Sequence, residues 1–176
     1  SNLDVRRAGA NLLIPLGQSG KELAIGALDD EDRVVQRKAA KALLYFDEPS
    51  VAERLFQHAN DAVRMTGMNH TSLPENSLRL GLEDPHDGVR EAALDNVFKR
   101  QIHVSMDALL PFLEAGLQTV NILIWVAQHE PHRLGELTAR IKPRDMNSLS
   151  AHLRREMEHS DEPLVQHLLE GGLLEP

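Results

Sequence analysis

The sequence predicts an all-α fold, an α-solenoid of about five to six stacked helical hairpins. Three observations support this fold class: a motif that recurs roughly every thirty residues, apolar residues at helical spacing, and a core composition suited to close helix packing. Of the 176 residues 41% are hydrophobic but only 3% are aromatic, so Leu, Ala, Val, Ile and Met must build the core. No alternation typical of strands persists along the chain.

The repeat is anchored by valines at intervals of 26 to 31 residues. The anchors are Val5, Val35, Val63, Val89 and Val120. Seven residues before each of the last four stands a large apolar residue: Leu28, Phe56, Leu82 and Leu113. Four residues after the first four stands a small residue, which is expected to let two helices approach closely: Gly9, Ala39, Gly67 and Ala93. Ile124 breaks this pattern in the fifth unit.

Local echoes support the repeat. The segment VRRAGAN at 5–11 resembles VRMTGMN at 63–69, and DEPSVAERL from Asp47 resembles DEPLVQHLL from Asp161. Chance could produce either echo alone, but it is a poor explanation of both together with a sustained period.

The individual helices follow from apolar spacing and breaks. Two anchored helices carry an apolar face with i, i+4, i+8 spacing, which is expected to be buried: Val35, Ala39, Leu43, Val89, Ala93 and Val97. The helix from Val63 is expected to end early, in NHTSLP. Ser105 is expected to cap a helix through Leu113, with Asp107 near its positive end. Pro15 and Pro111 sit inside apparent helices and should kink them or shift their boundaries.

Residues 1–130 are expected to form the repeat array, and residues 131–176 to form helices that continue or cap it. These later helices are expected at Leu134–Ile141, Arg144–Glu158 and Pro163–Leu169. No helix is expected before Asp4, and a solenoid needs a polar cap at its end. The chain is therefore expected to be a fragment of a longer protein, or to have this end covered by a partner.

A recurring motif, LxDxxxxVRxxA, is carried by Leu82, Asp84, Val89, Arg90 and Ala93. It recurs at Leu28, Asp30, Val35 and Ala39, where Gln36 replaces the arginine, and His58 stands where the third unit should have Asp. The motif resembles that of the HEAT-repeat family, including the short HEAT-like repeats of the phycobilin-lyase type, over roughly residues 3–130. The resemblance implies fold far more specifically than function.

The composition limits the classes of partner that the chain is expected to bind. The net charge is -8, which disfavours nucleic acid as a partner. The chain has no Cys and hence no disulfide or thiolate site, in keeping with a cytoplasmic location. The longest apolar run, 122–127, is too short to insert into a membrane, and the start SNLDVRRAG does not resemble a signal peptide.

Two features are candidate metal sites, and Trp125 is a candidate for the aromatic residues that some HEAT-like DNA glycosylases use. The acidic loop 29–32 could bind a cation, but capping of the next helix and pairing with Arg is the favoured interpretation. His129-Glu130 with His132 is the densest histidine cluster, and His152 and His159 lie seven residues apart. One His-Glu pair cannot hold the two-metal site of HEAT-like hydroxylases, and Trp125 in its apolar run is expected in the core. No metal, cofactor or catalytic residue is therefore expected.

Basic residues give the favoured functional hypothesis. Arg33, Arg37, Lys38 and Lys41 lie on one helix beside Arg6 and Arg7 of the preceding unit. They form either a solvated face paired with acidic loops or a binding strip for an acidic protein or peptide. The expected function is a non-catalytic binding scaffold that uses its concave face, with these candidate binding residues: Arg6, Arg37, Lys41, Arg64 and Arg90. The alternatives are a HEAT-like enzyme of the lyase or metal-hydroxylase type, and a DNA-repair module.

Overall fold

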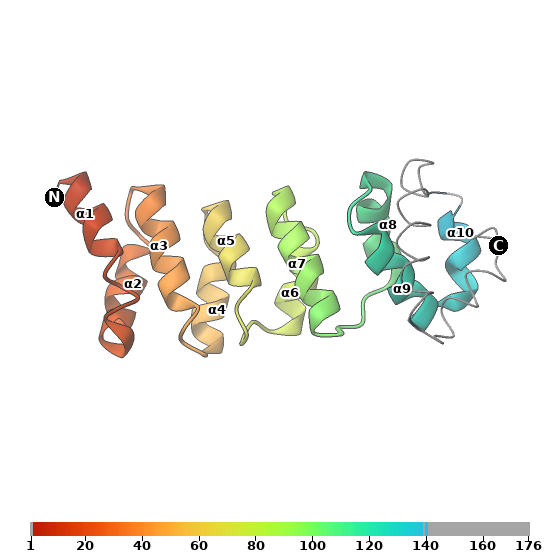
Figure 1. Ribbon diagram of the computed structural model, residues 1–176, viewed down its shortest axis with the longest axis horizontal. Helices are drawn as coiled ribbons and strands as arrows, with labels where there is room; N and C mark the ends of the chain where they lie inside the picture. The colour runs from red at the N-terminus through yellow and green to blue at the C-terminus, as the bar shows by residue number, and fades with distance from the viewer. Residues whose placement is uncertain (1, 139, 141–176) are drawn as a thin grey trace, which may run out of the picture. The chain divides into compact units, whose positions relative to one another are not determined.

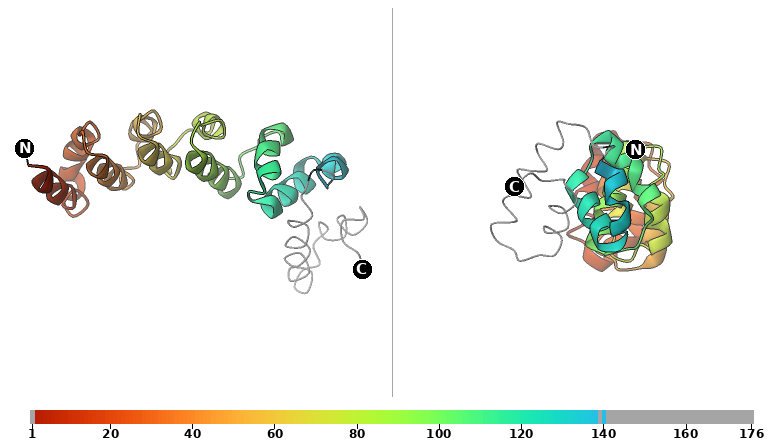
Figure 2. Two further views of the ribbon diagram at one scale, coloured as in Figure 1. Left: turned by 90° about the horizontal axis from the view of Figure 1, so that it is seen from above. Right: turned by 90° about the vertical axis from the view of Figure 1, so that its right-hand side faces the viewer.

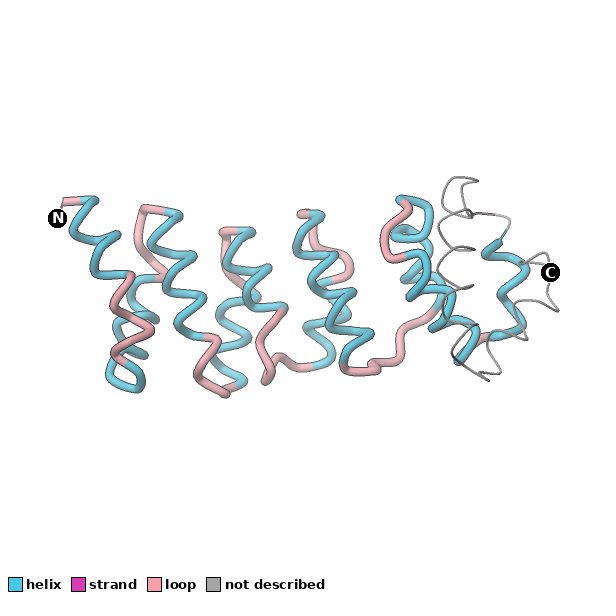
Figure 3. Tube along the Cα trace, in the orientation of Figure 1, coloured by secondary structure: helices cyan, strands magenta, loops and turns pink. Residues whose placement is uncertain are grey.

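The computed structural model describes residues 2–138 and residue 140, and this part of the chain consists of helices joined by loops, without a strand (Figure 3). The helices are α1 (Leu3–Ala10), η1 (Gly17–Gly20), α2 (Lys21–Ala27), α3 (Arg33–Leu43), α4 (Pro49–Phe56), α5 (Asp61–Met68), α6 (Glu75–Gly81), α7 (Asp87–Lys99), α8 (Met106–Ala115), α9 (Thr119–His129), η2 (Pro131–Arg133) and α10 (Leu134–Thr138). The prediction of an all-α fold is confirmed. The predicted helices Arg144–Glu158 and Pro163–Leu169 lie outside the described residues.

The chain divides into two compact units, the first ending at Ile102 and the second beginning at His103. The division falls at a non-helical segment that follows Gln101, whose φ is 52°, and it lies inside the region 1–130 expected as one array. In the first unit α2 packs on α3, α4 on α5 and α6 on α7. The helices α1, α3, α5 and α7 lie side by side in one row (Figures 1 and 2).

The core of the first unit forms where the valine repeat predicts it. All six residues expected to be buried are buried: Val35, Ala39, Leu43, Val89, Ala93 and Val97. The anchor Val63 is fully buried as well, and Gly67 lies so close to α4 that an added Cβ would stand 2.8 Å from the backbone nitrogen of Phe56. The small residue of the repeat therefore allows a close helix contact at this position, as predicted.

The repeat fails at its two ends. Val5 is 65% exposed, and a Cβ added at Gly9 would meet nothing within 4 Å, because no described helix covers that face of α1. In α9 the anchor Val120 is only half-buried, while Thr119 and Ile122 are buried instead. Val120 therefore does not hold the buried position that Val35, Val63 and Val89 hold.

The different position of Val120 has a local cause. In α3, α5 and α7 the anchoring valine is the third residue after the N-cap, which is Asp32, Asn60 or His86. The helix α9 starts after Gln118, so Val120 is only the second residue. A helix turns about 100° per residue, and a shift of one position moves the side chain away from the core.

Other helix boundaries follow local chemistry. Ser105 caps α8 by accepting a hydrogen bond from the amide of Ala108, and Asp107 lies in the first turn, both as predicted. Pro15 lies between α1 and η1, so it shifts a helix boundary, whereas Pro111 is accommodated within α8. No helix in the described part of the chain is long and apolar enough to cross a bilayer.

Candidate functional site

The residues that follow Val35, Val63 and Val89 each fix the loop that precedes their own helix. Gln36 Nε2 donates to the carbonyl of Asp30 at 2.6 Å, and Arg90 Nη1 donates to the carbonyl of Asp84 at 2.8 Å. Arg64 Nη1 does the same to the carbonyls of His58 and Ala59, each at 3.0 Å. This position of the repeat is therefore structural in three consecutive units.

The same residue also links one helix pair to the next. Arg64 donates from Nε and Nη2 to the two carboxylate oxygens of Asp84, at 2.8 and 3.0 Å, and both side chains are largely buried. Burial opposes the charge of Asp84. The guanidinium of Arg64 and the amide of His86 nevertheless donate to the carboxylate, and the net effect lowers the pKa of Asp84.

Three carboxylates of the acidic loop 29–32 form ion pairs with arginines, as Asp84 does with Arg64. Arg6 Nε lies 2.9 Å from Asp30, and Arg54 lies 3.0 Å from Asp29. Arg7 lies 2.7 Å from Asp32, which also caps α3. The hydrogen bond from Arg7 is the main reason that the pKa of Asp32 falls to about 2, and the capping amides of Val34 and Val35 add to it. Capping and pairing with Arg thus account for this loop, as the sequence favoured.

Between α3 and the loop before α5, the link consists of neutral side chains. Gln36 Oε1 accepts from Asn60 Nδ2 at 2.7 Å, in place of an Arg–Asp pair. His58 Nδ1 accepts from the amide of Asn60 at 3.0 Å, and His58 Nε2 lies 3.0 Å from the carbonyl of Leu28. An imidazole that accepts at Nδ1 donates at Nε2, so His58 serves here as a neutral side chain.

The five predicted binding residues therefore separate into two groups. Arg6, Arg64 and Arg90 are engaged with carboxylates of their own or the next unit, Arg90 with Asp87 at 2.5 Å. The other two, Arg37 and Lys41, are exposed on α3 and have no hydrogen-bond or ion-pair partner among the described residues.

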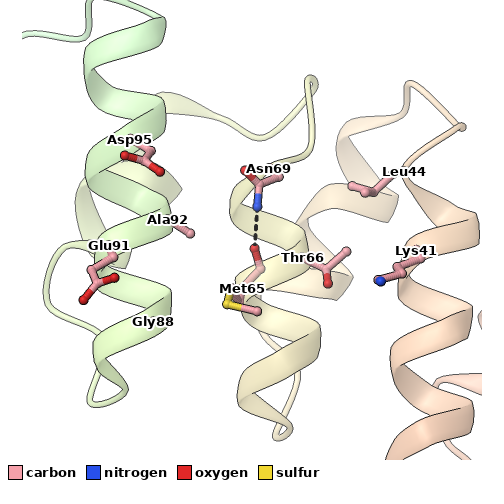
Figure 4. Close-up of a pocket in the computed structure, with 9 residues that line it drawn as sticks. All are labelled: Lys41, Leu44, Met65, Thr66, Asn69, Gly88, Glu91, Ala92 and Asp95. Atoms are coloured by element: carbon pink, nitrogen blue, oxygen red, sulfur yellow. Dashed lines mark hydrogen bonds between the residues drawn. The ribbon is translucent and has the colours of Figure 1, made fainter.

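Lys41 borders a groove of about 480 Å³ across α3, α5 and α7 (Figure 4). This volume lies within the usual range for ligand pockets, about 300–1,000 Å³. The lining residues are Lys41, Leu44, Met65, Thr66, Asn69, Gly88, Glu91, Ala92 and Asp95. The structure thus brings one of the predicted binding residues to a groove that sequence reasoning did not identify.

The polar groups at the floor of the groove are already satisfied. Thr66 donates its hydroxyl to the carbonyl of Ala62 at 2.8 Å, and Asn69 donates to the carbonyl of Met65 at 3.1 Å. Asn69 also accepts from Asn96 at 3.1 Å. The apolar side chain of Met65, which is 39% exposed, and the charged residues of α3 and α7 are therefore the groups that a ligand would meet.

The groove residues occupy fixed places in the repeat. Six residues after the anchors stand Lys41, Asn69 and Asp95, and two residues after them stand Met65, Glu91 and Arg37, of which Arg37 does not line the groove. Along this row of helices the side chains change from basic on α3, through neutral on α5, to acidic on α7. The sequence contains this gradient, but only alignment of the three helices at their anchors makes it visible.

In the second compact unit His129, one of the candidate metal ligands in the sequence, packs in a cluster of rings with Trp125 and His103. The rings of Trp125 and His129 stack with centroids 4.2 Å apart, and His129 Nδ1 lies 2.8 Å from the carbonyl of Trp125. Trp125 is buried, as predicted. Across the described residues no three His, Cys, Asp or Glu side chains are grouped to hold a metal ion. His152 and His159 fall outside that part of the chain.

No protein-family model matches the chain, and a search of curated proteins found no significant match.

Proposed function

We propose that the chain is a non-catalytic binding module, a HEAT-like α-solenoid that holds a protein or peptide on the exposed face of its second helices. The packing of α2 on α3, α4 on α5 and α6 on α7 supports the repeat architecture. The buried Arg64–Asp84 pair and its neutral counterpart Gln36–Asn60 recur between successive units. Such links favour a rigid surface, which lowers the entropic cost of binding.

The groove across α3, α5 and α7 is the observation that carries the proposal. It is open, lies on three successive second helices, and exposes Met65 in its floor. Methionine is flexible and polarisable, and it is common at surfaces that accommodate peptides. The ion pairs of Arg6, Arg7 and Arg64 instead tie α1 and α5 to Asp30, Asp32 and Asp84 in the loops before α3 and α7.

Selection of peptides from a displayed random library against the chain tests this function. Peptides enriched by the wild type should lose about tenfold or more in affinity when Met65→Glu puts an unpaired charge in the groove floor. The matched control is Leu80→Glu, because Leu80 is another exposed apolar residue, 59% exposed on α6, and does not line the groove.

Helix content and melting temperature should be unchanged in both variants. Failure to enrich any peptide would contradict the proposed function. So would a set of peptides that binds the Met65→Glu variant as tightly as the wild type.

A further inference from the structure

The two sides of the groove carry opposite charge. Lys41 comes from α3, with Arg37 one turn earlier, whereas Glu91 and Asp95 come from α7. In Figure 4 the helix α5 lies between them and contributes Met65. A ligand that crosses the groove from α3 to α7 therefore meets a cation first, an apolar side chain next and carboxylates last.

Two neighbouring charges on α3 are already engaged. Arg33 lies 3.5 Å from Asp61, and Lys38 donates to the carbonyl of Arg7 at 3.2 Å. In contrast, Lys41 and Glu91 have no polar partner within the described ranges and form no ion pair with each other. The charges that remain for a ligand are thus of both signs and stand on opposite sides of α5.

A uniformly acidic ligand fits this arrangement poorly. It would gain at Lys41 but would place like charges against Glu91 and Asp95, and such juxtaposition suppresses wrong partners. The acidic peptide expected from the basic residues alone therefore matches only one side of the groove. Charge complementarity favours a ligand that carries both signs.

We infer that the groove selects a peptide with an acidic side chain and a basic side chain on either side of an apolar one. The acidic group lies against Lys41, the apolar group against Met65 and the basic group against Glu91. This inference rests on the proposed peptide-binding function and specifies its ligand.

The experiment compares the peptides that one displayed random library yields with the wild type and with charge variants. Wild-type peptides should be enriched in both acidic and basic residues around an apolar one. Lys41→Glu should shift the selected peptides toward basic residues only, and Glu91→Lys toward acidic residues only. The double variant, Lys41→Glu with Glu91→Lys, should again select peptides of mixed charge, because it exchanges the two sides.

Matched controls separate the groove from net charge. Lys99 occupies the last turn of α7 as Lys41 does that of α3, and Glu83 is an exposed acid outside the groove. Lys99→Glu and Glu83→Lys should both keep the wild-type peptide profile. All these residues are exposed, so unchanged helix content and melting temperature are expected.

The outcomes distinguish the two proposals. No enrichment with the wild type overturns both the binding function and the inference. A second result overturns the inference but not the binding function. In that case Met65→Glu abolishes enrichment, but Lys41→Glu and Glu91→Lys select peptides with the same charge profile as the wild type. Profiles that change equally in the control variants also overturn the inference.

Discussion

At the scale of single residues, two departures from the repeat motif compensate for each other. Gln36 stands where three other units have Arg, and His58 stands where two other units have Asp. The position that Gln36 occupies faces the loop of the next repeat. At the same position in other repeats, Arg64 pairs with Asp84 and Arg6 pairs with Asp30. A neutral amide at this place leaves no cation for an Asp, so a neutral His avoids an unpaired charge. The sequence shows both departures, but only the structure shows that they belong to one link.

Removal of one partner of a charged link should destabilise the protein strongly. Arg64→Ala leaves the buried carboxylate of Asp84 without its guanidinium, which costs about 3–5 kcal/mol for a buried pair. Arg37→Ala is the control, because Arg37 is exposed and has no partner in the described part of the chain, and it should change stability by less than about 0.5 kcal/mol. Urea unfolding followed by circular dichroism measures both. Equal losses would show that the link does not stabilise the scaffold.

At the scale of the helices, periodicity predicts more than composition can. The valine anchors identify the buried faces of α3, α5 and α7 because each anchor is the third residue after its N-cap. The same rule fails at Val120, where the N-cap is displaced and the spacing in sequence no longer matches the spacing along the helix. Boundaries depend on capping geometry, which a spacing rule does not contain.

Two glycines at the same repeat position should respond oppositely to alanine. A Cβ at Gly67 would stand 2.8 Å from a backbone atom of Phe56 and 2.9 Å from Leu55 Cβ, so Gly67→Ala must push α4 away and should cost about 1–3 kcal/mol. At Gly9 nothing lies within 4 Å, so Gly9→Ala should stabilise α1 by about 0.5–1 kcal/mol through helix propensity. Thermal melting of the two variants beside the wild type tests this. Destabilisation by Gly9→Ala would mean that α1 is covered by a further contact.

At the scale of the whole molecule, the sequence predicts local features better than relations between units. The all-α fold and the buried valine ladder follow from patterns that lie within one helix. The groove escaped prediction because Lys41, Met65 and Glu91 come from three helices, and their proximity depends on how units pack. For the same reason the sequence could not separate engaged arginines such as Arg64 from exposed ones such as Arg37.

Contacts between successive helix pairs also make the free energy of unfolding depend on pH in the acidic range. Asp32, Asp47 and Asp84 all have a lowered pKa in the folded state, chiefly through hydrogen bonds from Arg7 for Asp32 and from Ser72 for Asp47. For Asp84 burial is the largest single effect and raises the pKa, but the hydrogen bonds from Arg64 and from the amide of His86, together with the positive charge of Arg64, outweigh it. A carboxylate with a lowered pKa contributes stability that is complete above its unfolded pKa, about 3.9, and is lost as the pH falls through the folded value.

For Asp32 the folded pKa is about 2, so its contribution should disappear as the pH falls from about 4 to about 2. Arg7→Ala removes the main cause of the low pKa, and the unfolding free energy should then fall less steeply across this window. Arg37→Ala removes an equal charge that contacts no described carboxylate, and it should keep the wild-type slope. Urea titrations at a series of pH values give these slopes. If Arg7→Ala and Arg37→Ala follow the same pH dependence, the contact between α1 and the acidic loop is not a source of acid sensitivity.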